Sequence, residues 1–238
     1  MFYFDFINGK KVLKSDKLKS AEHFFTTRET IIKSKEPDMK DLVEENKKLI
    51  SEYLSVKELI YPSQTHSANV KLAETGVKIY PETDALILDN FEQGIFLNFA
   101  DCTPIILYDK KRNIGAVSHA GWRGTAQKIG PKTIDVMGSN PEDITAIIGP
   151  AIGFCCYEVG EDVFNKLKST VKNFDGLYEG NKVDLKGINA RQLEEVGVKD
   201  IDICPYCTSC NNDLFFSYRK ENGTTNRHSA VLRLKKGG

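Results

Sequence analysis

Residues 85–120 read ALILDNFEQGIFLNFADCTPIILYDKKRNIGAVSHA, and this stretch decides the fold. It contains four short apolar runs, which cover residues 85–88, 94–99, 104–108 and 114–118. Apolar runs of this length between turn residues are typical of strands that are buried on both faces. We therefore expect a largely buried β-sheet at the centre of the chain.

Patterns on both sides of this stretch predict further elements. Residues 1–14 suggest a hairpin with an Asn8-Gly9 turn, and Asn140-Pro141 suggests a capped helical start. Helical periodicity or helix-end signals cover residues 38–54, 161–168 and 186–196, and a helical stretch after Gly124 should break at Gly130-Pro131. Further strands are expected at 146–150, 214–219 and 229–234. The expected fold is α/β (α+β), a single compact domain over residues 1–238 with a mixed β-sheet core flanked by helices.

Composition narrows the function classes. The chain has 238 residues, and its 33 basic residues equal its 33 acidic residues. No net field therefore favours a nucleic acid or an anionic membrane as partner. The N-terminus MFYFDFINGKK resembles neither a signal peptide nor a spanning helix, so we expect a soluble, cytoplasmic protein. Six cysteines in such a protein favour metal binding or chemistry over disulfides.

Three candidate metal ligands lie among small or polar residues at predicted strand ends. They are His66, Cys102 and His119. Two imidazoles and a thiolate suit Zn²⁺, and three protein ligands leave a fourth position for water or substrate. Asp84 and Asp101 are candidate acceptors that would orient an imidazole. The alternative is two structural histidines and a small buried cysteine, because separations of 36 and 17 residues match no local metal motif.

Several motifs in order resemble the YfiH-like family, whose members have been described as polyphenol oxidases or laccases and linked to purine nucleoside phosphorolysis and deamination. The motifs are FTTR (25–28), QTH (64–66), TDAL (83–86), ADCTP (100–104), HAGWRGT (119–125), IGPAIG (148–153), CYEV (156–159) and FFSYR (215–219). The resemblance implies that His66, Cys102 and His119 bind zinc. It also implies that purine nucleosides and phosphate are substrates, with adenosine deaminase and methylthioadenosine phosphorylase activity alongside.

Candidate catalytic residues follow from these two reactions. A zinc-bound water can attack C6 of adenine while a carboxylate moves protons, and Asp84, Asp101 and Glu158 are the candidates. Phosphorolysis requires a positively charged side chain that binds phosphate. Arg123 is the first candidate because it follows His119 by four residues.

Substrate-binding roles are expected for four further side chains. Arg28 and Arg219 are additional candidates for holding phosphate, Trp122 can stack on a base, and Gln64 is expected to contact substrate. For each arginine the alternative is a solvated charge or a structural ion pair. For Trp122 the alternative is packing in the core.

The number of histidines favours zinc over copper. Four histidines in the whole chain are too few for a multicopper centre, although a site of this kind can also bind Cu²⁺. Two overlapping CxxC spacings indicate a candidate second metal site at Cys204, Cys207 and Cys210, with Cys155 or Cys156 as a fourth thiolate. Editing of peptidoglycan precursors, copper-dependent polyphenol oxidation and a noncatalytic zinc-binding module remain alternative functions. The preferred nucleoside and the oligomeric state stay open.

Overall fold

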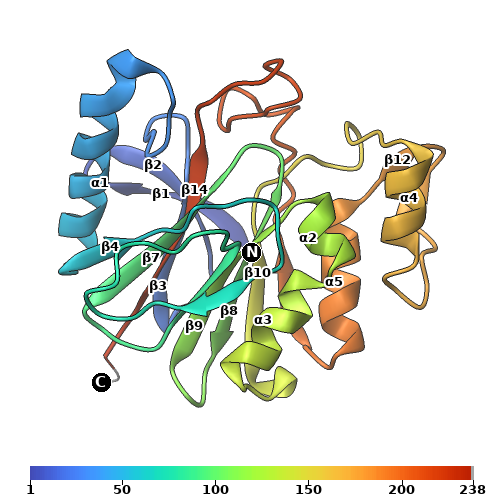
Figure 1. Ribbon diagram of the computed structural model, residues 1–238, viewed down its shortest axis with the longest axis horizontal. Helices are drawn as coiled ribbons and strands as arrows, with labels where there is room; N and C mark the ends of the chain where they lie inside the picture. Colours follow the sequence, from blue (N-terminus) through green and yellow to red (C-terminus); the bar gives the residue numbers. More distant parts are fainter. Residues whose placement is uncertain (237–238) are drawn as a thin grey trace.

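The computed structural model describes residues 1–236, in which two six-stranded mixed sheets pack face to face between layers of helices (Figure 1). The first sheet has the order β1-β2-β3-β14-β7-β4, formed by Phe2–Ile7, Lys10–Ser15, Ala21–Thr26, His228–Leu234, Gln93–Phe99 and Glu58–Ile60. The second has the order β13-β10-β8-β9-β6-β5, formed by Asp200–Ile203, Ile144–Ile148, Thr103–Asp109, Ile114–Ala120, Ala85–Leu88 and Val70–Leu72. Neighbouring strands are antiparallel except β4 beside β7, β5 beside β6 and β13 beside β10.

The four apolar runs that predicted one sheet are divided between the two. β6, β8 and β9 lie in the second sheet, whereas β7 pairs with the C-terminal strand β14 in the first. The chain therefore crosses from one sheet to the other in the short link 100–102 between β7 and β8. This crossing places the link where the two sheets meet.

Helices cover the outer faces of both sheets. The α-helices are α1 (Lys40–Leu54), α2 (Trp122–Ala126), α3 (Ile129–Met137), α4 (Glu161–Lys168) and α5 (Leu185–Glu195). Helix α1 packs Ile50 and Leu54 against the first sheet, and α3 and α5 pack Ile134 and Leu193 against the second. Figure 1 shows α1 on one side of the molecule and α2 to α5 on the other. The apolar cluster between the sheets combines residues from both, such as Leu232 of β14 and Val117 of β9.

Most of the predicted elements are confirmed. The β1–β2 hairpin turns at Asn8 and Gly9 with φ values of 46° and 78°, as a two-residue turn requires. Short 3₁₀ helices occupy Pro37–Met39 and Pro141–Asp143, and the Asn140 side chain accepts from the Glu142 N–H at the second. The predicted break at Gly130-Pro131 is wrong in position, because α3 runs through both residues. The helical stretch breaks at Lys128, which adopts a left-handed conformation. Pro131 falls in the first turn of α3, where a missing N–H costs no helical hydrogen bond.

The predicted strand at 214–219 is wrong. These residues form turns, in which the N–H groups of Leu214 and Phe215 both donate to the Asn211 carbonyl. The apolar character that suggested a strand comes from Phe215 and Phe216, which are fully buried side chains on a turning backbone. Strands β3, β4, β5 and β13 and the small pair β11 (Tyr178–Glu179) and β12 (Lys182–Val183) were not anticipated. Across residues 1–236, none of the helices has the length and apolar character needed to cross a membrane.

Candidate metal centre and pocket

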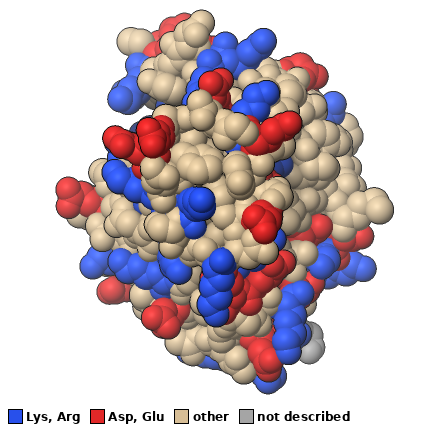
Figure 2. Space-filling view, turned by 90° about the vertical axis from the view of Figure 1, so that its right-hand side faces the viewer, with Lys and Arg blue, Asp and Glu red and all other residues tan. Residues whose placement is uncertain are grey.

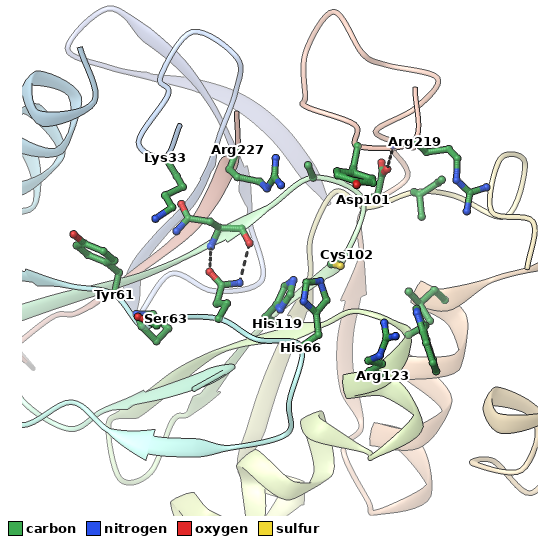
Figure 3. Close-up of a pocket in the computed structure, with 18 of the residues that line it drawn as sticks. Lys33, Tyr61, Ser63, His66, Asp101, Cys102, His119, Arg123, Arg219 and Arg227 are labelled. Carbon is green, nitrogen blue, oxygen red and sulfur yellow. Dashed lines mark hydrogen bonds between the residues drawn. The ribbon is translucent and has the colours of Figure 1, made fainter. Parts of the chain in front are cut away.

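A pocket of about 690 Å³ opens where the β7–β8 link, the loop between β4 and β5 and the end of β9 come together (Figure 3). Its volume is in the range of small-molecule sites. The lining residues are Lys33, Lys35, Tyr61, Pro62, Ser63, Gln64, His66, Asn98, Ala100, Asp101, Cys102, His119, Trp122, Arg123, Ile152, Tyr157, Leu185, Tyr218, Arg219 and Arg227.

Three of the lining residues bring their donor atoms together. His66 comes from the β4–β5 loop, Cys102 from the β7–β8 link and His119 from β9. Their candidate ligand atoms all lie within 4.8 Å of one another, and the two imidazole centroids are 4.9 Å apart. Figure 3 shows the three side chains pointing toward one another inside the pocket. We refer to these three residues as the His–Cys–His centre.

Asp84, the residue before β6, organises two of the three donors. Its fully buried carboxylate accepts from the N–H groups of Thr65, His66 and Ser67 at 3.1, 3.0 and 2.7 Å, and from the Ser67 hydroxyl at 2.7 Å. The same carboxylate lies 2.8 Å from Nδ1 of His119. A carboxylate on Nδ1 orients the ring and leaves Nε2 as the nitrogen available to a metal.

The backbone is strained at two points of the pocket. His66 and Asp101 have φ values of 62° and 87°, in a region that residues with side chains rarely adopt. The Asp84 hydrogen bonds hold the first of these, and Asp101 is held by bonds from the Thr208 hydroxyl (2.7 Å) and the Arg219 N–H (2.7 Å) to its carboxylate. Strain that persists under this many constraints is a common property of functional sites.

Gly121 provides the space that the centre requires. A Cβ atom at this position would lie 2.8 Å from the Cys102 sulfur and 3.2 Å from Cδ2 of His66. Distances this short would displace the thiol or the imidazole. The glycine after the His119 strand is therefore needed for the geometry of the centre.

The protonation states in the centre depend on mutual contacts. Burial raises the pKa of the Cys102 thiol, but the charge of His119 and hydrogen bonds from both imidazoles outweigh burial and lower it to about 6. Burial lowers the pKa of His119, but the Cys102 thiolate and Asp84 outweigh this and raise it to about 9. Burial also raises the pKa of Asp84, yet hydrogen bonds from His119 and Ser67 lower it to about 2. The sulfur is thus readily deprotonated, which is the form that binds a metal.

Basic side chains surround the centre. Lys33, Lys35, Arg123, Arg219 and Arg227 line the pocket, whereas Asp101 is the one carboxylate among the lining residues described. The chain as a whole has no net charge, and the face in Figure 2 carries basic and acidic side chains side by side. The excess of positive charge is therefore a local property of the pocket, and it favours an anionic ligand.

Most of the site residues predicted from the sequence line the pocket, and several of them make specific contacts there. The Gln64 amide donates to the Asn98 carbonyl and accepts from the Asn98 N–H, both at 2.9 Å, and so joins the His66 loop to β7. The Arg123 guanidinium lies 4.2 Å from the Trp122 ring centroid. Arg219 lies over the Tyr157 ring at 5.6 Å.

Three predicted residues do not line the pocket. Asp84 lies behind His119, as described above. Arg28 pairs with Glu221 at 2.9 Å and stacks on the Phe216 ring at 4.3 Å. Glu158 uses its backbone carbonyl to accept from the Arg219 guanidinium at 3.3 and 3.4 Å.

Several lining residues were not predicted from the sequence, among them Lys33, Tyr61, Tyr157, Tyr218 and Arg227. Lys33 and Arg227 are brought together by an isolated bridge in which the Arg227 N–H donates to the Lys33 carbonyl at 3.1 Å. Nearly 200 residues separate them. Tyr157 and Tyr218 stood inside motifs already noted, so their position in those motifs was the available signal.

The donor set fits a metal ion. Two imidazole nitrogens and one sulfur converge, one ring is fixed by a carboxylate, and the remaining side faces the pocket, as in an open zinc site. The fold and this centre together define a class of two-sheet α+β proteins with a His–Cys–His centre at the sheet junction.

Sequence comparison specifies the family. The family model described as "Multi-copper polyphenol oxidoreductase laccase" matches residues 23–235, and the chain belongs to this family. It is 34% identical over 189 residues to a protein of Clostridium acetobutylicum named purine nucleoside phosphorylase, covering 77% of this chain and 80% of that one.

Solved structures agree with the family assignment. The crystal structure of the Bacillus licheniformis hypothetical protein YfiH superposes with a TM-score of 0.88 at 28% identity, and that of YlmD from Geobacillus stearothermophilus with 0.86 at 27%. Each superposition covers 98% of this chain and 99% of the other. The YfiH-like resemblance and the α+β fold class are thereby confirmed.

Proposed function

We propose that the chain is a zinc-dependent purine nucleoside phosphorylase, which converts a nucleoside and phosphate to a free base and ribose 1-phosphate. One observation carries the proposal, namely that the His–Cys–His centre opens into a pocket lined by five basic side chains. A relative of 34% identity named purine nucleoside phosphorylase supports it. Adenosine deaminase and methylthioadenosine phosphorylase activities are part of the same proposal.

The chain's own residues bind and orient the reactants. Arg123, Arg219 and Arg227 contact the phosphate, because guanidinium groups pair strongly with phosphate oxygens. Asp84 keeps the His119 ring and the His66 loop in place. Trp122 and Tyr157 offer aromatic surfaces for a base. Burial raises the pKa of Tyr157 further above neutral pH. The proton-transfer roles of Asp84, Asp101 and Glu158 stay predictions.

The donor set favours zinc over a multicopper centre. A zinc ion held by His66, Cys102 and His119 would supply Lewis-acid chemistry and lower the pKa of bound water. The other two histidines, His23 and His228, are buried outside the pocket lining. None of the three methionines lines it as an axial copper ligand would.

The decisive experiment incubates zinc-loaded protein with adenosine, inosine, guanosine or methylthioadenosine, with and without phosphate. Phosphate-dependent release of base and ribose 1-phosphate is the expected result. Inosine formed from adenosine without phosphate reports deamination separately. Reloading the metal-free protein with Zn²⁺ or Cu²⁺ assigns the metal, since only zinc should restore phosphorolysis.

The negative outcomes are equally defined. Absence of product from every purine nucleoside, with zinc bound, overturns the proposal. Release of free ribose rather than ribose 1-phosphate would show hydrolysis instead. Oxidation of a phenol by the copper-loaded protein, without phosphorolysis by the zinc form, would favour the polyphenol oxidase alternative.

A further inference from the structure

A second cluster of potential metal ligands lies outside the pocket lining. The Sγ atoms of Cys155, Cys156, Cys207 and Cys210 all lie within 4.8 Å of one another. The Cys210 sulfur is 3.4 Å from both the Cys155 sulfur and the Cys156 sulfur. We refer to these four residues as the four-cysteine cluster.

We propose that the four-cysteine cluster is a closed structural zinc site that ties together two of the segments forming the pocket. Four thiolates around Zn²⁺ make a tetrahedron with Zn–S bonds of about 2.3 Å, which separates neighbouring sulfurs by about 3.8 Å. Two sulfur–sulfur distances in the cluster are 3.4 Å and all of them are within 4.8 Å, a range that includes this spacing. Binding Zn²⁺ would release the remaining thiol protons to solvent.

The backbone around the cluster is arranged for close approach of the sulfurs. The Gly153 N–H donates to the Cys207 sulfur at 3.1 Å, a contact that favours the thiolate. A Cβ atom on Gly153 would lie 2.9 Å from the Cys207 Cβ and 3.3 Å from the Cys155 sulfur. Only glycine at this position lets the two cysteine-bearing turns meet.

Hydrogen bonds fix both turns. The N–H groups of Cys156 and Tyr157 donate to the Gly153 carbonyl at 2.9 and 3.0 Å. In the other turn, the backbone N–H and the side-chain amide of Asn211 both donate to the Cys207 carbonyl at 2.9 Å. The Thr208 N–H donates to the Ala151 carbonyl at 3.0 Å and joins the two turns directly. The four sulfurs are therefore preorganised.

The cluster differs from the set that the CxxC spacings suggested. Cys204 was a candidate ligand, but its side chain is fully buried in the core between the sheets and is not a member of the cluster. Both members of the adjacent pair Cys155 and Cys156 take part instead of one. All six cysteines are free in residues 1–236.

The position of the cluster explains what a metal there would do. The turn at 153–156 leads directly into Tyr157 of the pocket, and the turn at 207–210 carries Thr208, which donates to Asp101. Cys155 and Cys207 are about 50 residues apart in the sequence, so a shared ion would close a long loop. With four protein ligands no position is open for substrate, which assigns a structural role.

Two other fates of the four thiols are less compatible with the geometry. A disulfide would join one pair, yet Cys210 is equally near Cys155 and Cys156, so neither pairing is preferred. A redox pair would also leave two thiols of the cluster without a function. One tetrahedral ion uses all four sulfurs.

The test separates the two sites by working in a Cys102→Ala background, in which the His–Cys–His centre lacks its thiolate. Protein purified anaerobically under reducing conditions is analysed for zinc, and then loaded with Co²⁺, whose sulfur-to-metal charge-transfer absorption rises with the number of thiolates. We expect one zinc per chain in Cys102→Ala and two in the unmodified protein. The Co²⁺ form of Cys102→Ala should show the absorption of a tetrahedral four-thiolate site.

Single substitutions then identify the ligands. Cys155→Ser or Cys210→Ser, both at exposed residues and so tolerated by the fold, should weaken Co²⁺ binding at least tenfold in the Cys102→Ala background. Cys204→Ala is the matched control, since it removes a neighbouring thiol outside the cluster and should leave the absorption unchanged.

Three results would overturn the proposal. They are a fully reduced Cys102→Ala protein that binds neither zinc nor cobalt, an absorption that survives Cys210→Ser, and a disulfide within the cluster under the same anaerobic conditions. Metal content and absorption are measured without substrate, so these outcomes are independent of whether nucleosides are turned over.

Discussion

The His–Cys–His centre and the four-cysteine cluster are built from the same kinds of atoms in different settings. The first has three donors on the wall of a cationic pocket, and a carboxylate behind it fixes one ring. The second has four donors on two hydrogen-bonded turns, with Cys155 and Cys210 exposed. Three donors leave a position for chemistry, whereas four fill the coordination sphere of a tetrahedral ion. The number of donors therefore suits the His–Cys–His centre to a reaction and the four-cysteine cluster to stabilising the fold.

Loss of a ligand from the first site is expected to have the largest effect on turnover. His119→Ala should lower kcat/KM for nucleoside phosphorolysis by about 1,000-fold or more, because a catalytic metal contributes several kcal/mol to the transition state. Metal analysis should show one zinc lost and one retained. His23→Gln is the control, since His23 is a buried imidazole that accepts from the Ser15 N–H elsewhere. Retained activity in His119→Ala would remove that residue from the site.

Removal of the supporting charge is expected to have the next largest effect. Asp84→Asn should weaken zinc binding by about 10- to 100-fold, because the carboxylate orients His119 and holds the His66 loop. Competition with a chromophoric chelator measures the change. Asp109→Asn is a matched control, because Asp109 is another buried carboxylate that accepts from two backbone N–H groups, those of Lys111 and Arg112. Equal zinc affinities of Asp84→Asn and the unmodified protein would contradict the positioning role.

A change in the cationic lining should act on phosphate more than on the metal. Arg123→Gln is expected to raise KM for phosphate by about tenfold, the size of a charge-assisted hydrogen bond, and to leave the zinc content unchanged. Lys166→Gln is the control, because Lys166 also lies over the Trp122 ring, at 5.6 Å, but does not line the pocket. A similar KM change in both variants would show that the effect comes from Trp122 and not from a phosphate contact.

Loss of the second site should affect stability first and turnover least. Cys207→Ser combined with Cys210→Ser is expected to lower stability by about 3 kcal/mol, the effect of opening a long closed loop, and Tm by about 6–12 °C. Turnover at 25 °C should fall only a few-fold, because Tyr157, which lines the pocket next to the turn at 153–156, would be held less rigidly. Thermal unfolding with and without a zinc chelator measures the loss of stability. Equal chelator sensitivity of the variant and the unmodified protein would count against a structural ion.

The sequence alone predicted the local elements well, because strand and helix periods and turn residues are read over a few positions. The hairpin at Asn8-Gly9, the helix 38–54 and the four central strands were found in this way. The error at 214–219 has the same origin, since two buried phenylalanines on a turn look like part of a strand.

Candidate ligands were also visible in the sequence, because imidazole and thiol groups amid small residues are conspicuous and the ordered motifs reinforced them. The sequence alone thus determined the zero net charge, predicted most of the strands and helices, and indicated His66, Cys102 and His119 as candidate donors. These properties depend on residue type, on the residues next to each position and, for the candidate donors, on the ordered family motifs. They can be recognised in one sequence without a structure.

Only the tertiary structure decided which distant segments meet. It separated β7 from its sequence neighbours, brought Lys33 to Arg227 and placed both Cys155 and Cys156, but not Cys204, in the second cluster. Such contacts arise from the packing of two sheets and from turns bonded across 50 to 200 residues, and no local pattern encodes them. The pocket and both candidate metal sites exist because of that packing.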